Sequence, residues 1–473
     1  MYLLELSKQL RSIAKGPAYV YCPLMDFTQK STSYIRVYGK EISIKIPLDI
    51  EDLPQVKAIL KGTIFSSGHS VIAWDIKNLY SYMQHHTKSP LKWVSSGKEI
   101  SELIGDTEDK GRKEWLTDDT ESHELNKTPV VKNPAIFDLK VIERYRGKEL
   151  AEPQSYIDAM KRLRLVYNKD VANVYNKVHL PLLTQVIPDI ETVGIIRDKI
   201  KVHANYEVEG QVNGRLKCRG LFARTYNPHV IPSDERFLFK PTCWNCNDVT
   251  LSEMAFIELD YNALEVRVLQ WLSKDEKLGE MLSGGDVYLN MWNEITGQNE
   301  TGAEARSFMK GLFLPLVYGA GVATLAKTLN INEETANKLI NRTYEVFPDS
   351  FAYLESQQNS VKNGVITDCF GRKRVIEAGK EYQVRNFCVQ SPASTICLSK
   401  LIDLNDMLKI KKIGKIGFYV HDGYVIFLGK SNGKDVVRHS VRVLEAESAL
   451  APGLELAVSC HGGFVLNEMK SIK

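Results

Sequence analysis

The stretch at residues 256–273 reads FIELDYNALEVRVLQWLS, and it predicts a buried strand followed by a helix. The apolar strand ends at Asp260. Leu264, Val268 and Leu272 then recur every four residues, which is the spacing of one helix face. A carboxylate at the end of an apolar strand is costly without a partner, and a divalent cation is one that suits it. The structural alternative is an Asp that only caps the following helix.

A second acidic residue lies in KIGFYVHDGYVIF, residues 415–427. Apolar residues flank His421 and Asp422 on both sides, which predicts a hairpin with the carboxylate at its tip. Asp260 and Asp422, if brought together, could hold two Mg²⁺ ions about 4 Å apart. One ion would then activate a primer 3′-hydroxyl, and the other would stabilise a leaving pyrophosphate.

A cationic stripe is predicted in RSFMKGLFLPLVYGAG, residues 306–321. Arg306, Lys310, Leu314 and Tyr318 recur every four residues and therefore share one helix face. This pattern suits a triphosphate gripped by the two cations, with the aromatic ring stacking near a templating base. The alternative is a solvated basic face, which the Gly-Ala-Gly sequence starting at Gly319 makes less attractive.

Together, these three segments resemble motifs A, B and C of the family A DNA polymerases. DYNALEVR resembles motif A, the Arg/Lys/Tyr-Gly pattern resembles motif B, and VHDG resembles motif C. The resemblance covers about residues 178–473 and implies an α+β, right-hand fold with an antiparallel palm sheet. It places the palm at 178–285 and 361–473 and helical fingers at 286–360, with a reduced thumb.

The resemblance also implies the chemistry of the site. Asp260 and Asp422 would be the catalytic metal ligands for two Mg²⁺ ions, for which Mn²⁺ could substitute. Arg306 and Lys310 would clamp the triphosphate of a dNTP. Glu265 matches the family's steric gate, where a carboxylate crowds a ribose 2′-hydroxyl, so dNTPs rather than rNTPs are expected. An ordinary surface Glu is its structural alternative.

Three positions depart from the family pattern in the nucleotide site. Leu314 stands where an aromatic residue is usual, which predicts poor use of dideoxynucleotides. Tyr288, in GGDVYLNMW, occupies a place where the family often has a phosphate-contacting His. Gly423 replaces the Glu that normally follows the motif C Asp, so altered metal affinity is expected. Tyr318 remains the expected base-stacking residue.

Further segments resemble the family's DNA contacts. Arg215, in the VNGRLKC segment, would touch the primer strand. Asn386 and Gln390, in RNFCVQSPAST, match a helix that contacts the minor groove near the primer end. His421 would lie near the primer's terminal phosphate, and Gly319 near the template. Primer-template DNA is thus the expected partner.

Two regions are predicted to be degenerate or reduced. Between Gly194 and Arg215 there is no room for the long helical thumb, which predicts low processivity or a processivity factor that holds the DNA. Residues 1–147 resemble an RNase H-like, 3′–5′ exonuclease-like α/β domain, joined by a helical connector at 148–177. Its first strand offers Asp26 without the expected Asp-x-Glu, so proofreading is predicted to be absent or supplied by a separate exonuclease subunit.

Composition limits the class of protein and the compartment that the sequence can be assigned to. The 473 residues carry a net charge of +3, so a nucleic-acid surface must come from local arrangement. No apolar stretch is long enough for a membrane span and no signal peptide is recognised, which predicts a cytoplasmic protein of a bacterial or phage-infected cell. Cys243 and Cys246 form one CxxC without a second pair, which favours two unrelated thiols over half a zinc site.

Three other functions compete with an active DNA polymerase. A single-subunit RNA polymerase shares the palm and the Arg/Lys/Tyr-Gly helix, but Glu265 argues against ribonucleotides. A catalytically inactive polymerase-like subunit would only bind primer-template, and the retention of all four charged motif residues argues against it. The choice between a repair and a replicative polymerase stays open.

Overall fold

The computed structural model describes residues 2–15, 18–21, 34–39, 43–47, 53–65, 71–74, 136–147, 151–153, 156–167, 169–197, 200–218, 227–231, 233–242, 254–464, 466 and 469–472. Asp26, Cys243 and Cys246 lie outside these residues, so the predictions made for them stay predictions. Within this part of the chain no helix is long and apolar enough to span a bilayer.

The N-terminal region forms a mixed five-stranded sheet with strand order β3-β2-β1-β4-β5. β1 pairs antiparallel with β2 and parallel with β4, which in turn runs parallel to β5. The elements are β1 (Ala18–Tyr21), β2 (Tyr34–Tyr38), β3 (Ser43–Pro47), β4 (Val71–Trp74), β5 (Ile136–Asp138), α1 (Tyr2–Ile13) and α2 (Leu53–Leu60). The segment IFDLKVIERY forms β5 and the helix α5 (Leu139–Tyr145), whereas the likeness of the region to an exonuclease remains a prediction.

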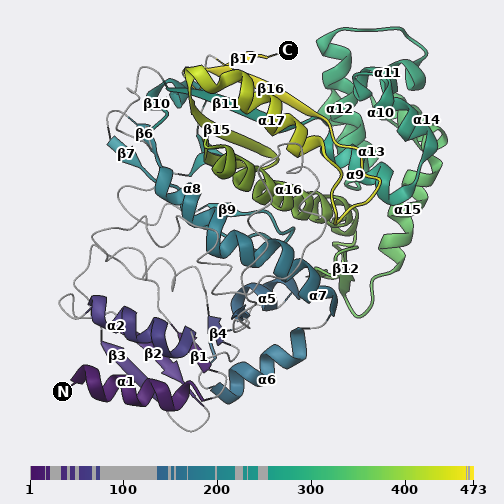
Figure 1. The fold of residues 1–473 in the computed structure, drawn as a ribbon. Helices are drawn as coiled ribbons and strands as arrows, with labels where there is room; N and C mark the ends of the chain where they lie inside the picture. The colour runs from purple at the N-terminus through teal and green to yellow at the C-terminus, as the bar shows by residue number, and fades with distance from the viewer. Residues whose placement is uncertain are drawn as a thin grey trace.

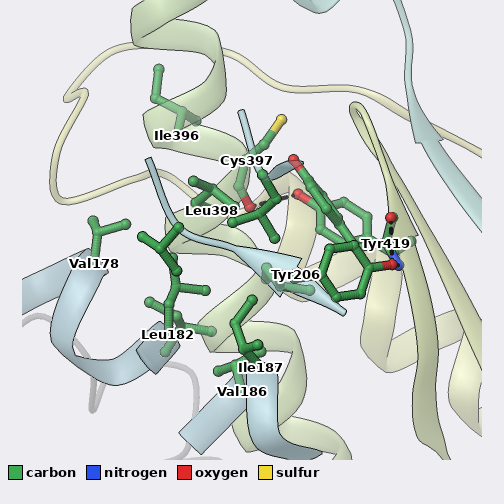
Figure 2. Close-up of a cluster of buried hydrophobic side chains, with 14 of the residues drawn as sticks. Val178, Leu182, Val186, Ile187, Tyr206, Ile396, Cys397, Leu398 and Tyr419 are labelled. Carbon is green, nitrogen blue, oxygen red and sulfur yellow. Dashed lines mark hydrogen bonds between the residues drawn. The ribbon is translucent and has the colours of Figure 1, made fainter. Parts of the chain in front are cut away.

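A helical connector joins this sheet to the rest of the molecule (Figure 1). Within the expected bounds of 148–177 it contains α6 (Tyr156–Val166), α7 (Lys169–Val174) and the start of a π-helical turn (Tyr175–His179). The helical run continues past these bounds in a second π-helical turn (Leu182–Val186) and α8 (Ile187–Val193), and the whole run is called the connector from here on. Figure 2 shows its apolar residues packed against the long helix α16 (Gln383–Lys411). Val178 and Leu182 lie there with Leu398, and Tyr206 donates its hydroxyl hydrogen to the carbonyl of Tyr419 across 2.8 Å. This buried cluster ties the connector to the palm.

The palm is a five-stranded antiparallel sheet of order β14-β15-β11-β16-β17, which confirms the predicted fold class. Its strands are β14 (Lys415–Val420), β15 (Gly423–Gly429), β11 (Met254–Tyr261), β16 (Val458–Gly463) and β17 (Lys470–Ser471). Strand β11 is largely buried on both faces, since the consecutive residues Phe256 and Ile257 are both buried, and it becomes exposed at Asp260. Helices α16 and α17 (Gly433–Glu445) pack on each other and on this sheet.

A run of helices between β11 and α16 forms the opposite end of the molecule from the N-terminal sheet (Figure 1). Several begin with a side-chain cap, in which Asp275, Asp286 or Asn332 accepts from a backbone N–H of the first turn. The helices are α9 (Leu264–Ser273), α10 (Glu276–Ser283), α11 (Val287–Thr296), α12 (Ala303–Val317), α13 (Val322–Leu329), α14 (Glu333–Val346) and α15 (Pro348–Asn359). The helical character expected of residues 286–360 is therefore present.

Three short strands lie in the segment in which a thumb is expected, namely β6 (Ile195–Arg197), β7 (Ile200–Val202) and β8 (Tyr206–Glu207). Two more follow it, β9 (Lys217–Cys218) and β10 (Phe239–Lys240). Between Gly194 and Arg215, the residues that the structure describes form strands and turns and no helix. A separate hairpin of β12 (Val365–Thr367) and β13 (Lys373–Val375) lies before α16.

Candidate active site

The two predicted metal ligands meet at one end of the palm sheet. Asp260 is the second-last residue of β11, and its pairing partner on β15 is Gly423. His421 and Asp422 form the two-residue turn between β14 and β15, and His421 adopts a left-handed φ of 53° to make that turn. Asp422, which precedes Gly423 directly, is therefore held next to Asp260, as the hairpin pattern predicts.

The electrostatics of Asp260 indicate crowded negative charge. Its carboxylate remains accessible, yet partial desolvation, followed by repulsion from Asp422 and Glu258, raises its pKa to about 6. The charge of Lys310 on α12 partly opposes this rise in pKa. Carboxylate oxygens crowded in this way are ligands that a hard divalent cation prefers, so the pair fits the predicted magnesium site. Among the described residues, no group of three or more His, Cys, Asp or Glu side chains forms a metal site.

Arg215 joins the metal-ligand pair to the predicted steric gate. Its Nη2 atom lies 3.0 Å from Glu265 Oε1 and 3.4 Å from Asp422 Oδ1. Burial raises the pKa of Glu265 to about 7, with Asp422 adding to the rise and Arg215 and Gln390 opposing it. Arg215 Nε is buried and has no hydrogen-bond partner among the described residues.

A tight turn presents Arg215 to this site. Asn213 donates to Gln390 Oε1 across 3.1 Å and accepts from the backbone N–H of Arg215 at 3.3 Å. Gly214 has a φ of +77°, and a side chain there would meet the Arg372 guanidinium at 2.3 Å. Only glycine suits this position, because the conformation is left-handed and the space is taken. Gln390, predicted from the sequence, thus helps to hold the turn.

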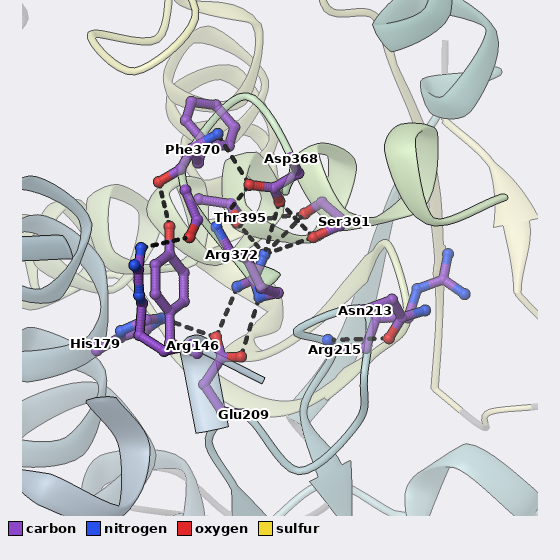
Figure 3. A network of polar contacts seen from close by, with 12 residues as sticks. Arg146, His179, Glu209, Asn213, Arg215, Asp368, Phe370, Arg372, Ser391 and Thr395 are labelled. Carbon is purple, nitrogen blue, oxygen red and sulfur yellow. Dashed lines mark hydrogen bonds and ion pairs between the residues drawn. The ribbon is translucent and has the colours of Figure 1, made fainter. Parts of the chain in front are cut away.

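Beneath the turn lies a buried polar network centred on Arg372 (Figure 3). Its guanidinium makes two hydrogen bonds to Glu209, at 2.6 and 3.0 Å, and one to Ser391 Oγ at 2.8 Å. The Arg372 and His179 contacts lower the pKa of Glu209 to about 2, against the effect of burial. The ring of Tyr145, from α5, lies 4.9 Å from the guanidinium. The N-terminal region, the connector and the palm therefore meet at one buried cation.

The predicted triphosphate clamp lies on α12. Arg306 Nε donates to Asp286 Oδ2 across 2.6 Å, and its guanidinium lies 5.5 Å from the centroid of the Tyr288 ring. Asp286 also accepts from the backbone N–H groups of Tyr288 and Leu289, so one carboxylate caps α11 and orients Arg306. Tyr288 is buried, and Glu265 adds to the rise in its pKa that burial causes. Tyr288 therefore interacts both with Arg306, the proposed triphosphate ligand, and with Glu265, the predicted steric gate.

The remaining predicted residues lie around these groups. Leu314 and Tyr318 are half-buried and pack against the apolar core, while Gly319 follows with a φ of +88°. Asn386 is half-buried on α16, one turn before Gln390. His421 is exposed, and its ring centroid lies 5.0 Å from that of His229.

Several residues of the site were not predicted from the sequence. Asp286 carried a usable signal, because an Asp directly before an apolar helix is a common N-cap. Asn213 and His229 carried none, since their importance depends on contacts with residues far along the chain. Arg372 and Glu209 were also missed, because a charged pair gives no sign in the sequence that it will be buried.

Comparison with known proteins agrees with this geometry. The profile of DNA polymerase family A matches residues 182–466, more than half of the chain. DNA polymerase I of Bacillus caldotenax is 26% identical over 227 residues, covering 45% of this chain and 26% of the relative. DNA polymerase I of Caldicellulosiruptor bescii is 29% identical over 232 residues, covering 45% and 27%. The chain thus spans about a quarter of the length of these relatives.

A solved structure shows the same fold. The POL domain of Pol1 from M. smegmatis, in complex with DNA primer-template and dNTP, superposes with a TM-score of 0.66. The match covers 98% of both chains at 14% sequence identity, a level at which the likeness concerns the fold alone. The family follows from the profile match over residues 182–466. The chain belongs to DNA polymerase family A.

Proposed function

We propose that this chain is a DNA-directed DNA polymerase that adds dNTPs to a primer 3′-hydroxyl by two-metal-ion nucleotidyl transfer. The observation that carries the proposal is the meeting of Asp260 and Asp422 at one end of the palm sheet, where the charge of Lys310 partly offsets their repulsion. Membership of the family supports this activity, and the M. smegmatis complex supports primer-template DNA and dNTPs as partners. Divalent cations are proposed as Mg²⁺, with Mn²⁺ as a substitute.

In the proposed reaction, the primer 3′-hydroxyl loses its proton to solvent, and its oxygen forms a bond to the α-phosphorus of the dNTP. The bond from that phosphorus to the bridging oxygen breaks, and pyrophosphate leaves with the electron pair. Bound metal ions would supply Lewis-acid stabilisation of the charge on the attacking and leaving oxygens. Asp260 and Asp422 are proposed to hold them, because their crowded carboxylates gain most from added positive charge.

Cations on α12 are proposed to bind the triphosphate. Asp286 occupies the Nε of Arg306, which leaves the two terminal amino groups of the guanidinium to form paired hydrogen bonds with a phosphate. Lys310, one turn on, adds a point charge beside the carboxylates. The ring of Tyr288 contacts the Arg306 guanidinium in a cation–π arrangement, which helps to hold Arg306 in place.

Selection of the sugar is proposed to depend on Glu265 and Leu314. Arg215 and Gln390 orient the Glu265 side chain, so it is a fixed obstacle to a ribose 2′-hydroxyl. Leu314 offers no ring or hydroxyl at the 3′ side, which predicts weak use of dideoxynucleotides. Tyr318 and Gly319 are proposed to contact the templating base, and Arg215, Asn386, Gln390 and His421 the primer end.

Low processivity and the absence of proofreading are also proposals. The described residues between Gly194 and Arg215 offer few surfaces for gripping duplex DNA, so binding should be sensitive to salt. In the N-terminal region, Asp138 caps α5 and Glu143 pairs with Arg162 at 2.6 Å. Both carboxylates therefore have structural partners, which supports a domain without nuclease chemistry and a separate exonuclease or processivity partner.

The test is extension of a labelled primer on a DNA template with Mg²⁺, comparing the wild type with Asp422→Ala. Parallel reactions contain dNTPs, rNTPs or no nucleotide. We expect extension with dNTPs alone, loss of extension in the variant by at least about 10³-fold, in the range found for groups that stabilise transition-state charge, and no primer shortening without nucleotide. Extension with rNTPs would favour a single-subunit RNA polymerase. A wild type that binds the DNA without extending it would favour an inactive primer-template binding subunit.

A further inference from the structure

Tyr382 lies against the end of the motif helix α12 and remains exposed. It directly precedes α16, and 52% of its surface is accessible, although it is a large aromatic residue. A side chain at Gly319 would begin 3.3 Å from Tyr382 Cβ and 3.4 Å from its carbonyl oxygen. The Tyr382 backbone is therefore packed closely beside Tyr318 and Gly319, while its ring extends into solvent.

Basic side chains surround the exposed ring. Burial lowers the pKa of Arg374, and the nearby Tyr382 hydroxyl opposes that effect, which places the two groups together. Lys380 is accessible, and its ammonium lies 2.5 Å from Glu377, which raises the pKa of Lys380. The nearby Tyr382 hydroxyl adds to this rise in pKa. Arg374 donates to Gln383 Oε1 across 2.6 Å, which fixes the guanidinium at the start of α16. An accessible aromatic ring close to two basic side chains is the composition of a single-stranded nucleic-acid contact.

We propose that Tyr382 is a stacking platform for the first unpaired template base, the nucleotide on the 5′ side of the templating base. A lone exposed tyrosine is ordinary on a protein surface. Here the Tyr382 backbone adjoins Gly319, which together with Tyr318 is proposed to contact the templating base, so the next base of the strand can reach the exposed Tyr382 ring. The inference rests on the proposed function and adds a binding site for single-stranded template to it.

The stacking of a base needs a ring face but no hydroxyl. Tyr382→Phe keeps the ring and should therefore behave as the wild type, whereas Tyr382→Ala removes the platform. Tyr344→Ala is a matched control, because Tyr344 is a partly exposed tyrosine on another helix, α14. Duplex binding by the palm should not change in any of these variants.

The experiment measures binding of primer-template DNA without dNTP, with 2-aminopurine at the first unpaired template position. Stacking on a tyrosine ring quenches this base, so the wild type and Tyr382→Phe should quench and Tyr382→Ala should not. Titrations with a five-nucleotide template overhang and with a blunt end give the second readout. We expect Tyr382→Ala to weaken the Kd for the overhang substrate about tenfold, equivalent to about 1.4 kcal/mol, and to leave the blunt-end Kd unchanged.

The outcomes separate this inference from the proposed function. If the wild type extends the primer but Tyr382→Ala quenches and binds as the wild type does, the stacking site is wrong and the polymerase proposal stands. Loss of quenching in Tyr382→Phe would also contradict stacking, because the ring is still present. If the wild type neither binds nor extends the DNA, the proposed function fails and the inference fails with it.

Discussion

Asp260 on β11 and Gly423 on β15 are paired partners, and a methyl group added to Gly423 would lie 3.4 Å from Asp260 Oδ1. This is ordinary van der Waals contact, and the φ of Gly423 is not in the left-handed region, so a Cβ fits at the position without strain. A Glu there would bring a third carboxylate beside the proposed metal ligands.

Gly423→Glu is expected to lower the Mg²⁺ concentration for half-maximal primer extension by about tenfold, equivalent to about 1.4 kcal/mol of metal binding. The added carboxylate offers another hard oxygen ligand. Without metal, like-charge repulsion should lower the Tm of the variant, and Mg²⁺ should restore it. Gly423→Gln is the control of equal size, and a similar gain in that variant would show that charge is not the cause.

Removing the Asp260 charge is expected to stabilise the metal-free protein. The folded pKa of about 6 exceeds the ordinary 3.8, so the native state loses stability as the pH rises from about 4 to about 6. Asp260→Asn should avoid this loss and gain about 1 kcal/mol at pH 8, a figure that allows for solvent screening of an accessible group. Thermal unfolding with and without Mg²⁺ measures it.

The effect of Mg²⁺ on the Tm tests the prediction made for Asp260→Asn. Ion binding to the native state should raise the Tm of the wild type, and Asp260→Asn should respond less because a ligand is lost. Equal Mg²⁺ responses in the two proteins would contradict the assignment of Asp260 as a ligand. An unchanged metal-free Tm at pH 8 would contradict the claim that the carboxylates repel each other.

Local sequence patterns predicted the strands and helices that carry the chemistry, but not what surrounds them. The strand before Asp260, the hairpin at Asp422 and the helix from Arg306 were predictable, because each combines a regular apolar period with a polar interruption. The Arg372 network was not, since its partner Glu209 lies 163 residues away in the chain. Long-range polar pairing leaves no local period, so only the folded chain shows it.

Asp286 is expected to act through Arg306. Asp286→Ala removes both the cap of α11, which costs about 1 kcal/mol, and the carboxylate that orients the guanidinium. The KM for dNTP should rise about five- to tenfold, the equivalent of about 1 kcal/mol, with a smaller change in kcat. Steady-state extension kinetics measure this split.

Asp286→Asn separates the two roles, because Asn caps helices as well as Asp does but carries no charge. Its Tm should match the wild type, whereas its KM should lie between those of the wild type and Asp286→Ala. A wild-type KM in both variants would show that the Asp286–Arg306 contact plays no part in binding dNTP.

Gly214→Ala is expected to destabilise the protein and to displace Arg215. The left-handed backbone alone costs about 1 kcal/mol, and the overlap with the buried Arg372 guanidinium should add about 2 kcal/mol. Gly285→Ala is the matched control, because Gly285 also has a positive φ, of 105°, but open space around it. Urea unfolding should show the larger loss in Gly214→Ala, and equal losses would mean that Arg372 moves aside freely.

Arg215→Ala is expected to destabilise the metal-free protein more at pH 8 than at pH 5.5. Arg215 lies between Glu265 and Asp422, and its removal leaves two largely buried carboxylates without their cation. The pKa of Glu265 is already about 7 with Arg215 present, so at pH 5.5 this carboxyl is protonated and the penalty is small. At pH 8 it is charged, and the loss should reach about 2 kcal/mol.

Two control variants separate charge from packing. Arg215→Lys keeps a positive charge and should lose less stability at pH 8. Glu265→Gln combined with Arg215→Ala should remove most of the pH dependence. Urea unfolding of these variants at both pH values measures the effect, and a loss in Arg215→Ala that is independent of pH would show that packing, rather than charge, is what Arg215 contributes.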